Sequence, residues 1–153
     1  PSYSESNRLN YFIGRTYEGA YFKYKNPETS KDIVFFENLI NWNQPIVLCE
    51  GAFDAIAIRR NAVPILGKNM SNALMKKIIT SSAQDIYIAL DQDAQKDALQ
   101  ISEKLLNLGK RVFLVDLKQK DPSEMGFKAF TRLIQSAVEL DLSGLMLHKI
   151  NAI

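Results

Sequence analysis

A short apolar run that ends abruptly in an acidic residue and a glycine constrains this chain most. Residues 46–54 read Ile-Val-Leu-Cys-Glu-Gly-Ala-Phe-Asp. Four consecutive apolar residues are too few for a helix and are typical of a fully buried strand. Open α/β sheets form their binding and catalytic sites at the carboxyl ends of parallel strands. Glu50, followed by a turn at Gly51, is therefore predicted to lie at such a site.

Two later segments repeat this design. Residues 86–90 are apolar and lead into Asp91-Gln92-Asp93, and the apolar residues 112–115 lead, after a short loop, into Lys120-Asp121-Pro122. The carboxyl ends of neighbouring parallel strands lie along one edge of a sheet. We therefore expect four carboxylates to converge there, those of Glu50, Asp91, Asp93 and Asp121.

From Pro45 onward, apolar strands alternate with amphipathic helical segments. This pattern predicts an α/β fold with a parallel sheet of about four strands sandwiched by helices. A fourth, short strand is expected at residues 63–66, ended by a turn at Gly67, and Pro64 favours a strand end or an edge. The expected helices span residues 52–61, 71–82 and 94–108, and a further helical segment begins at residue 122.

The remaining segments differ from this core. Runs of aromatic and β-branched residues at 11–15 and 20–24 flank Glu18-Gly19 and predict a hairpin. Residues 34–42 fit either a strand or a short helix. We therefore divide the chain into a small β-rich segment (1–44), the sheet domain (45–140) and a C-terminal helical tail (141–153).

Composition narrows the class of protein. The chain has 153 residues, of which 46% are hydrophobic and 24% are charged, as expected of one globular domain with a full core. No apolar run reaches the ~18 residues that a membrane span needs, so no membrane partner is expected. The single cysteine, Cys49, excludes an internal disulfide and a cysteine-based zinc site.

The N-terminus predicts where the protein acts. It lacks the layout of a signal peptide, so we expect a cytoplasmic protein. It also lacks an initiator Met, which suggests a portion of a longer polypeptide.

The expected cluster of acids needs a neutralising partner. Two carboxylates ~5 Å apart repel by about 3 kcal/mol at an effective dielectric constant of ~20. Mg²⁺ prefers such oxygen ligands and often shares them with substrate phosphates. In an extended segment Asp91 and Asp93 would face the same way, and Glu50 could act as a further ligand or as a general base. This arrangement suits phosphoryl transfer, in which metal ions stabilise the attacking and leaving oxygens.

Each acid also has a purely structural interpretation. Glu50 could be a solvated loop residue, and Asp91 or Asp93 could cap the helix that begins at Ala94. Asp121 precedes Pro122 and could be an N-cap with proline at the first helical position. For Asp54 we favour capping of the helix after Gly51.

The order of these motifs is more specific than any one of them. The segment 46–54 resembles the Glu-Gly motif of the Toprim family, the catalytic domain shared by topoisomerases and bacterial- or phage-type DNA primases. Lys120-Asp121-Pro122-Ser123-Glu124 is similar to the Lys-Asp-Pro-x-Glu signature of the primase branch. Upstream, Gly14-Arg15 and residues 23–29 (Lys-Tyr-Lys-Asn-Pro-Glu-Thr) resemble the segments that precede Toprim in the primase core.

This resemblance implies a DNA primase that uses Mg²⁺ or Mn²⁺, with two ions, to make RNA primers on single-stranded DNA. Glu50 would be the acid–base residue, and Asp91, Asp93 and Asp121 would be metal ligands. Nucleotide or template phosphates would be bound by four cations, Arg15, Lys23, Lys68 and Lys120. Nucleoside triphosphates and a replicative helicase would be partners, and residues 1–44 would be a remnant of the basic N-terminal subdomain.

Other functions remain open at this point. One is a Toprim nuclease or topoisomerase subunit, against which the Lys-Asp-Pro-x-Glu segment argues. Another is a Toprim module that binds nucleic acid without catalysis. A receiver-like module is disfavoured, because a receiver has its acid pair after the first strand and here the pair follows the third.

Overall fold

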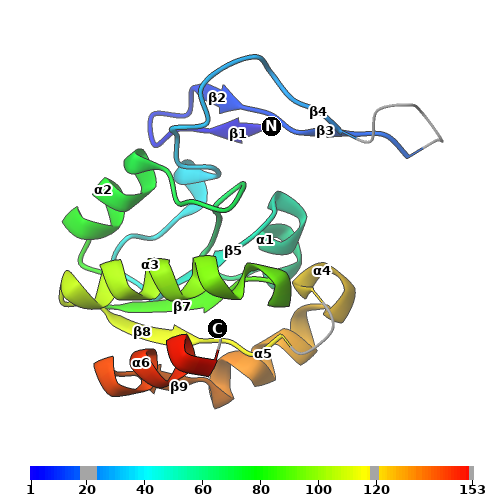
Figure 1. Cartoon of the computed structure of the whole chain (residues 1–153). Coiled ribbons are helices and arrows are strands. Elements are labelled where there is room, and N and C mark those ends of the chain that lie inside the picture. The colour runs from blue at the N-terminus through cyan, green and yellow to red at the C-terminus, as the bar shows by residue number, and fades with distance from the viewer. Residues whose placement is uncertain (18–23, 118–120, 152–153) are drawn as a thin grey trace.

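The protein is a mixed α/β structure built around one five-stranded sheet (Figure 1). We describe a computed structural model, in which residues 1–17, 24–117 and 121–151 are defined. The strands of the sheet lie in the order β6-β5-β7-β8-β9. Their bounds are β5 (Ile46–Cys49), β6 (Ala62–Pro64), β7 (Asp85–Ala89), β8 (Arg111–Leu114) and β9 (Val138–Leu140).

The register of the sheet aligns the ends of its central strands. β5 pairs in parallel with both β6 and β7, β7 pairs in parallel with β8, and β9 runs antiparallel to β8. Cys49 lies opposite Ala89, so β5 and β7 leave the sheet at the same level. Glu50 and Asp91 are therefore delivered to the same edge.

Helices cover both faces of the sheet (Figure 1). One core lies against α2 (Asn72–Thr80), α3 (Gln95–Asn107) and α6 (Leu142–Asn151). The opposite core lies against α1 (Ala52–Ile58) and α5 (Phe127–Ser136), which follows the single turn α4 (Pro122–Met125). No helix among the described residues has the length and apolarity needed to span a bilayer.

The apolar run of β5 explains why it lies near the centre of the sheet. Ile46 and Leu48 pack into the first core, and Val47 and Cys49 pack into the second. Alternate residues of a strand face opposite sides, so a strand covered on both faces must be apolar throughout. The carboxylate of Glu50 is the first polar group that the chain can place outside this double core.

The N-terminal segment forms two small antiparallel ladders beside the α/β unit (Figure 1). One joins β1 (Ser2–Tyr3) to β2 (Leu9–Tyr11), and the other joins β3 (Gly14–Arg15) to β4 (Tyr24–Lys25). Tyr11 and Phe35 pack with Ala52 at the start of α1, which attaches the segment to the edge that carries Glu50.

The predicted fold class is confirmed, with differences in detail. The prediction of about four parallel strands holds for β5 to β8, and Pro64 ends the edge strand β6 as expected. The helical interpretation of the segment that begins at residue 122 and of the tail missed the antiparallel strand β9 between them. The ambiguous residues 34–42 contain a 3₁₀ turn, η1 (Glu37–Leu39). Gly14 and Arg15 pair with Lys25 and Tyr24 as a hairpin requires, and its expected turn at Glu18-Gly19 lies outside the described residues.

Candidate active site

Glu50 leaves the sheet on a backbone held by the segment that follows β6. The carbonyl of Cys49 accepts a hydrogen bond from Ile65 at 2.9 Å, and that of Glu50 accepts one from Leu66 at 3.1 Å. One carboxylate oxygen of Glu50, Oε2, is buried and has no hydrogen-bond partner among the described residues. Burial raises the pKa of Glu50, and the charges of Asp91 and Asp93 raise it further. Burial and the neighbouring acids thus both disfavour the charged form of this carboxylate.

Asp91 and Asp93 meet Glu50 at this edge. One carboxylate oxygen from each of the three residues lies within 4.8 Å of the others. Asp91 is extended, whereas Asp93 lies in the 3₁₀ turn η2 (Gln92–Ala94) that precedes α3. The expectation of one extended segment was therefore wrong in its backbone, although the turn still brings the two acids together. Asp91 occupies the N-cap position of η2 and makes no side-chain capping bond, so its carboxylate is not used as a cap.

Asp54 and Asp121 form a neighbouring pair of acids. Asp54 is only 8% exposed, and its two oxygens accept hydrogen bonds from the backbone N–H groups of Gly51 and Ser123. Asp121 accepts hydrogen bonds from the Ser123 hydroxyl at 2.7 Å and the Glu124 amide at 2.8 Å, so it caps α4. The cap that we favoured for Asp54 is present, since its carboxylate reaches back to the amide at the start of α1.

These acids influence one another electrostatically. Burial raises the pKa of Asp54, and the charge of Asp121 adds to that rise. Burial likewise raises the pKa of Asp91, with additional contributions from Asp54, Asp121 and Asp93. The group that can share one ion among the described residues consists of Glu50, Asp91 and Asp93, and Asp121 lies outside it.

The donor set fits a hard divalent cation. Three carboxylates face one another, one of their oxygens is buried with no partner in the part of the chain that the structure describes, and the pKa values of Glu50 and Asp91 are raised. A cation would neutralise the repulsion and satisfy the buried oxygen. Oxygen-only ligands of this kind suit Mg²⁺ or Mn²⁺ better than the softer transition metals.

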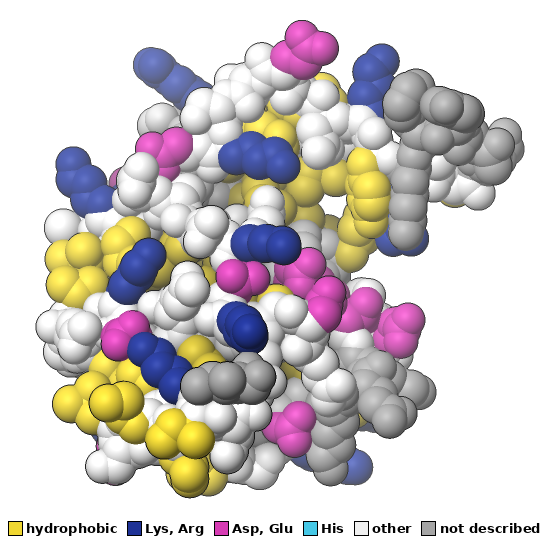
Figure 2. All heavy atoms as spheres, in the orientation of Figure 1, with side chains coloured by type: hydrophobic (Ala, Val, Ile, Leu, Met, Phe, Trp, Pro, Cys, Tyr) yellow, Lys and Arg dark blue, Asp and Glu magenta, His cyan; other side chains and the backbone are white. Residues whose placement is uncertain are grey.

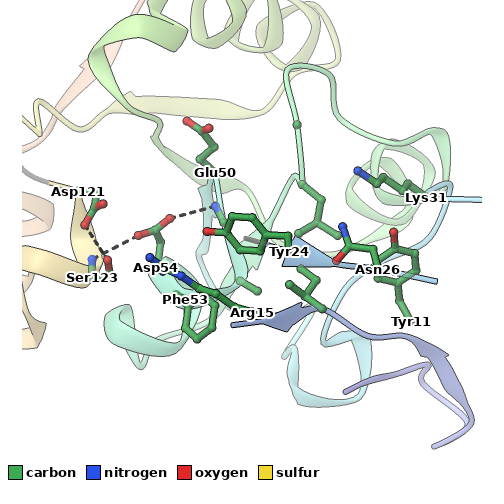
Figure 3. A pocket seen from close by; sticks show the side chains of 15 residues that line it. Tyr11, Arg15, Tyr24, Asn26, Lys31, Glu50, Phe53, Asp54, Asp121 and Ser123 are labelled. Atoms are coloured by element: carbon green, nitrogen blue, oxygen red, sulfur yellow. Dashed lines mark hydrogen bonds between the residues drawn. The ribbon is translucent and has the colours of Figure 1, made fainter. Parts of the chain in front are cut away.

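A cavity of about 370 Å³ lies between this edge and the N-terminal segment (Figure 3). Its lining includes three acids, Glu50, Asp54 and Asp121, together with Arg15, Tyr24, Asn26 and Lys31 from the N-terminal part of the chain. The guanidinium of Arg15 lies 5.5 Å from the centre of the Tyr24 ring and 5.7 Å from that of Phe53. In the same orientation as Figure 1, acidic side chains gather in a hollow flanked by basic ones (Figure 2).

Of the other predicted site residues, Gly51 and Gly67 line the cavity and Lys68 does not. Gly67 has a φ of +153°, and the side chain of the neighbouring Lys68 is exposed. Gly51 precedes α1, where an added Cβ would lie 3.0 Å from the Asp54 carboxylate. Lys23 and Lys120 lie outside the described residues.

Sequence reasoning missed several residues of the cavity. Asp54 was assigned only a cap, although it stands in the same Glu-Gly-x-x-Asp stretch and is charged and buried. Asn26 was part of the upstream motif and received no role. Lys31 had no sequence signal, because only the folding of the N-terminal segment over α1 brings it to the cavity.

Residues 47–126, a little over half of the chain, match the family model Toprim_2, described as Toprim-like. The chain belongs to the Toprim-like family. This Toprim-like chain is 33% identical over 102 residues to an uncharacterised protein of Mycoplasma pneumoniae, the MG010 homolog, and that match covers 63% of this chain and 48% of the relative.

Solved structures match this Toprim-like chain beyond the family segment. A DNA primase domain from Pseudomonas aeruginosa is 27% identical with a TM-score of 0.73, over 91% of this chain and 50% of that one. A DnaG primase catalytic domain bound to single-stranded DNA is 21% identical with a TM-score of 0.75, over 98% of this chain and 54% of that one, and shows the shared fold. The chain thus spans about half the length of these relatives.

Proposed function

We propose that this chain is the catalytic core of a DNA primase, which joins nucleotides on a single-stranded DNA template with the help of Mg²⁺ or Mn²⁺. The observation that carries the proposal is the meeting of Glu50, Asp91 and Asp93 within 4.8 Å, with one buried Glu50 oxygen left without a partner among the described residues. The fold of primase catalytic cores, one of them bound to single-stranded DNA, supports the choice of template.

Each acid has a role in this proposal. Asp91 and Asp93 would hold a divalent ion together with Glu50, which could instead accept the proton of the attacking 3′-hydroxyl. Asp121 would serve a second ion in addition to capping α4. The bound ions would supply charge stabilisation at the attacking and leaving phosphate oxygens.

The cations of the cavity would position the nucleotide. Arg15 and Lys31 line the same cavity as the acids, where cations can neutralise the phosphates that the ions do not reach. Lys23, Lys68 and Lys120 are proposed to assist in the same way. A replicative helicase would be a partner of the whole protein.

Incorporation of labelled nucleoside triphosphates on a single-stranded template, with Mg²⁺ or Mn²⁺, tests the proposal. We expect Asp91→Ala to lower incorporation by more than about a hundredfold, since even outer-shell partners of a metal are worth about 10- to 100-fold. Asp97→Ala, which removes an acid in the first turn of α3, is the matched control and should retain activity. Metal-dependent nicking of DNA without incorporation would favour a nuclease. Binding of DNA without either reaction would favour a non-catalytic module.

A further inference from the structure

A second groove lies between α1 and the α4–α5 segment. It encloses about 680 Å³ and is lined on one side by Phe53, Ile56 and Arg59 and on the other by Ser123, Phe127 and Lys128. The acid cluster of Glu50, Asp91 and Asp93 does not line it. The assignment of the catalytic acids therefore does not explain this groove.

Aromatic rings are available on this surface. Phe53 is 45% exposed and Phe127 is 39% exposed. The guanidinium of Arg60 lies 5.4 Å from the centre of the Phe127 ring and donates a hydrogen bond to the Thr131 hydroxyl at 2.9 Å. The Phe127 ring is therefore held partly by a contact between α5 and the end of α1. Exposed aromatic rings held by secondary structure are suited to stacking on flat ligands, such as nucleobases.

The charge of the groove selects an anionic ligand. Its described lining residues include two cations, Arg59 and Lys128, and no carboxylate. Both cations are exposed, and neither forms an ion pair with another described residue. A purely apolar peptide would use the rings and leave both charges unmatched, whereas single-stranded nucleic acid offers bases for the rings and phosphates for the cations.

The groove is continuous with the candidate active site. Phe53 and Ser123 line both the groove and the 370 Å³ cavity that contains Glu50. The ring of Phe53 faces Arg15 of the N-terminal segment at 5.7 Å, so it stands at the boundary between the two spaces. A single strand of nucleic acid bound in the groove would therefore lead directly to the acidic edge of the sheet.

We propose that the groove between α1 and α4–α5 binds single-stranded nucleic acid, with Phe53 and Phe127 stacking on bases and Arg59 and Lys128 facing phosphates. The choice of nucleic acid as the partner rests on the proposed function. The proposal adds to that function a path for the nucleic acid next to the acidic edge of the sheet. It assigns this binding to residues outside the group of metal-ligand candidates.

Fluorescence anisotropy with a labelled oligothymidylate, measured without divalent metal, tests the groove directly. Phe127→Leu keeps an apolar side chain and removes the ring, and it should weaken binding by about 5- to 150-fold, the range for loss of one stacked base. Phe127→Trp should restore it. An abasic oligonucleotide should bind wild type and Phe127→Leu equally, because it has no base to stack.

The charge of the groove is tested separately, with exposed residues whose substitution leaves the core intact. The double variant Arg59→Gln/Lys128→Gln should lower the slope of log affinity against log salt concentration by about 1.4, as expected for two phosphate contacts on a single strand. Lys104→Gln, an exposed cation near the end of α3, is the matched control and should leave the slope unchanged.

The outcomes separate this proposal from the proposed function. The proposal that the groove binds nucleic acid would be refuted by unchanged affinity and salt slope in the groove variants, or by an equal loss in Lys104→Gln. Failure of the wild type to bind the oligonucleotide would also refute it. The incorporation assay would still test catalysis. If binding depends on Phe127 but the chain incorporates no nucleotide, the groove remains a nucleic-acid binding site and the primase proposal is refuted.

Discussion

The carboxylate of Asp54 accepts a hydrogen bond from the backbone N–H of Ser123 at 3.3 Å, although 69 residues separate the two. Its other oxygen accepts the N–H of Gly51 at 3.0 Å. One buried acid therefore ties the start of α1 to the start of α4, and with them Glu50 to Asp121.

Asp54→Ala should destabilise the fold, because it leaves two backbone amides without this acceptor. Hydrogen bonds to charged groups are worth about 1.5–3 kcal/mol each, and relief of the buried charge offsets part of the loss. We expect the free energy of unfolding in urea to fall by about 1–3 kcal/mol. The control Gln100→Ala, at an exposed position of α3, should change it by less than about 0.5 kcal/mol. Equal effects of the two substitutions would show that the hydrogen bonds of Asp54 to Gly51 and Ser123 do not stabilise the fold.

Gly51→Ala should disturb the same carboxylate. The added Cβ would lie 3.0 Å from Oδ2 of Asp54, tighter than most contacts of real Cβ atoms, so the carboxylate must shift by a few tenths of an ångström. We expect a loss of stability in the wild type and a much smaller one in the Asp54→Ala background. A double-mutant cycle measures this coupling, expected at about 0.5–3 kcal/mol. Additive effects would show that Gly51 matters for another reason.

The pH dependence of stability without metal should have an unusual sign at this site. Burial raises the pKa values of Glu50, Asp54 and Asp91 in the folded chain, and their mutual charges add to the rise. The folded state therefore holds more protons than the unfolded state at intermediate pH. Stability attributable to these groups is lost as pH rises from their unfolded pKa through their folded pKa.

The substitution Asp91→Asn removes one of these charges and tests the sign. In chelator, thermal unfolding should show the variant gaining stability over wild type at about pH 7, with the difference vanishing near about pH 3, where carboxyl groups are protonated. Added Mg²⁺ should reverse the order at about pH 7, because it stabilises only the state that binds it. A variant less stable than wild type at about pH 7 in chelator would contradict the raised pKa of Asp91.

Lys77 connects the N-terminal segment to α2. Its ammonium lies 2.6 Å from a carboxylate oxygen of Glu5 and 3.1 Å from one of Glu37, and 5.6 Å from the centre of the Trp42 ring. Hydrogen bonding to Glu5 and Glu37 raises the pKa of Lys77, which favours its charged form. We expect Lys77→Ala to reduce the free energy of unfolding by about 1 kcal/mol.

The neighbouring exposed residue provides the control for this contact. Lys76→Ala should have an effect below about 0.5 kcal/mol in the same urea experiment. High salt should shrink the difference between the two variants, since ion pairs at the surface are screened. A salt-independent difference would indicate that packing of the Lys77 side chain, rather than its charge, holds the segment.

The sequence predicts those parts of the fold that depend on local pattern. The apolar run of β5 identifies a strand buried on both faces, and Ser71 caps α2 through the Leu74 amide as its position indicates. Strand β9 was missed because only Leu140 is buried, while Val138 is 78% exposed. One buried residue gives no strand periodicity, and pairing with β8 decides the conformation.

The candidate site was likewise predictable only in part. Parallel strands that end at the same level deliver Glu50 and Asp91 to one edge, so topology alone predicts their approach. The sequence left Asp121 open as either a metal ligand or an N-cap, and local pattern alone could not predict that it caps α4 and lies outside the three-acid group. The contribution of Lys31 to the cavity depends on how the N-terminal segment packs against α1, which no local pattern specifies.

Anomalous diffraction from a crystal soaked in Mn²⁺ tests most directly whether the three acids form a metal site. We expect a strong peak among the carboxylates of Glu50, Asp91 and Asp93, and we expect it to disappear in a crystal of Asp91→Ala. A well-ordered wild-type crystal with the three carboxylates in place and no peak beside them would refute the metal site.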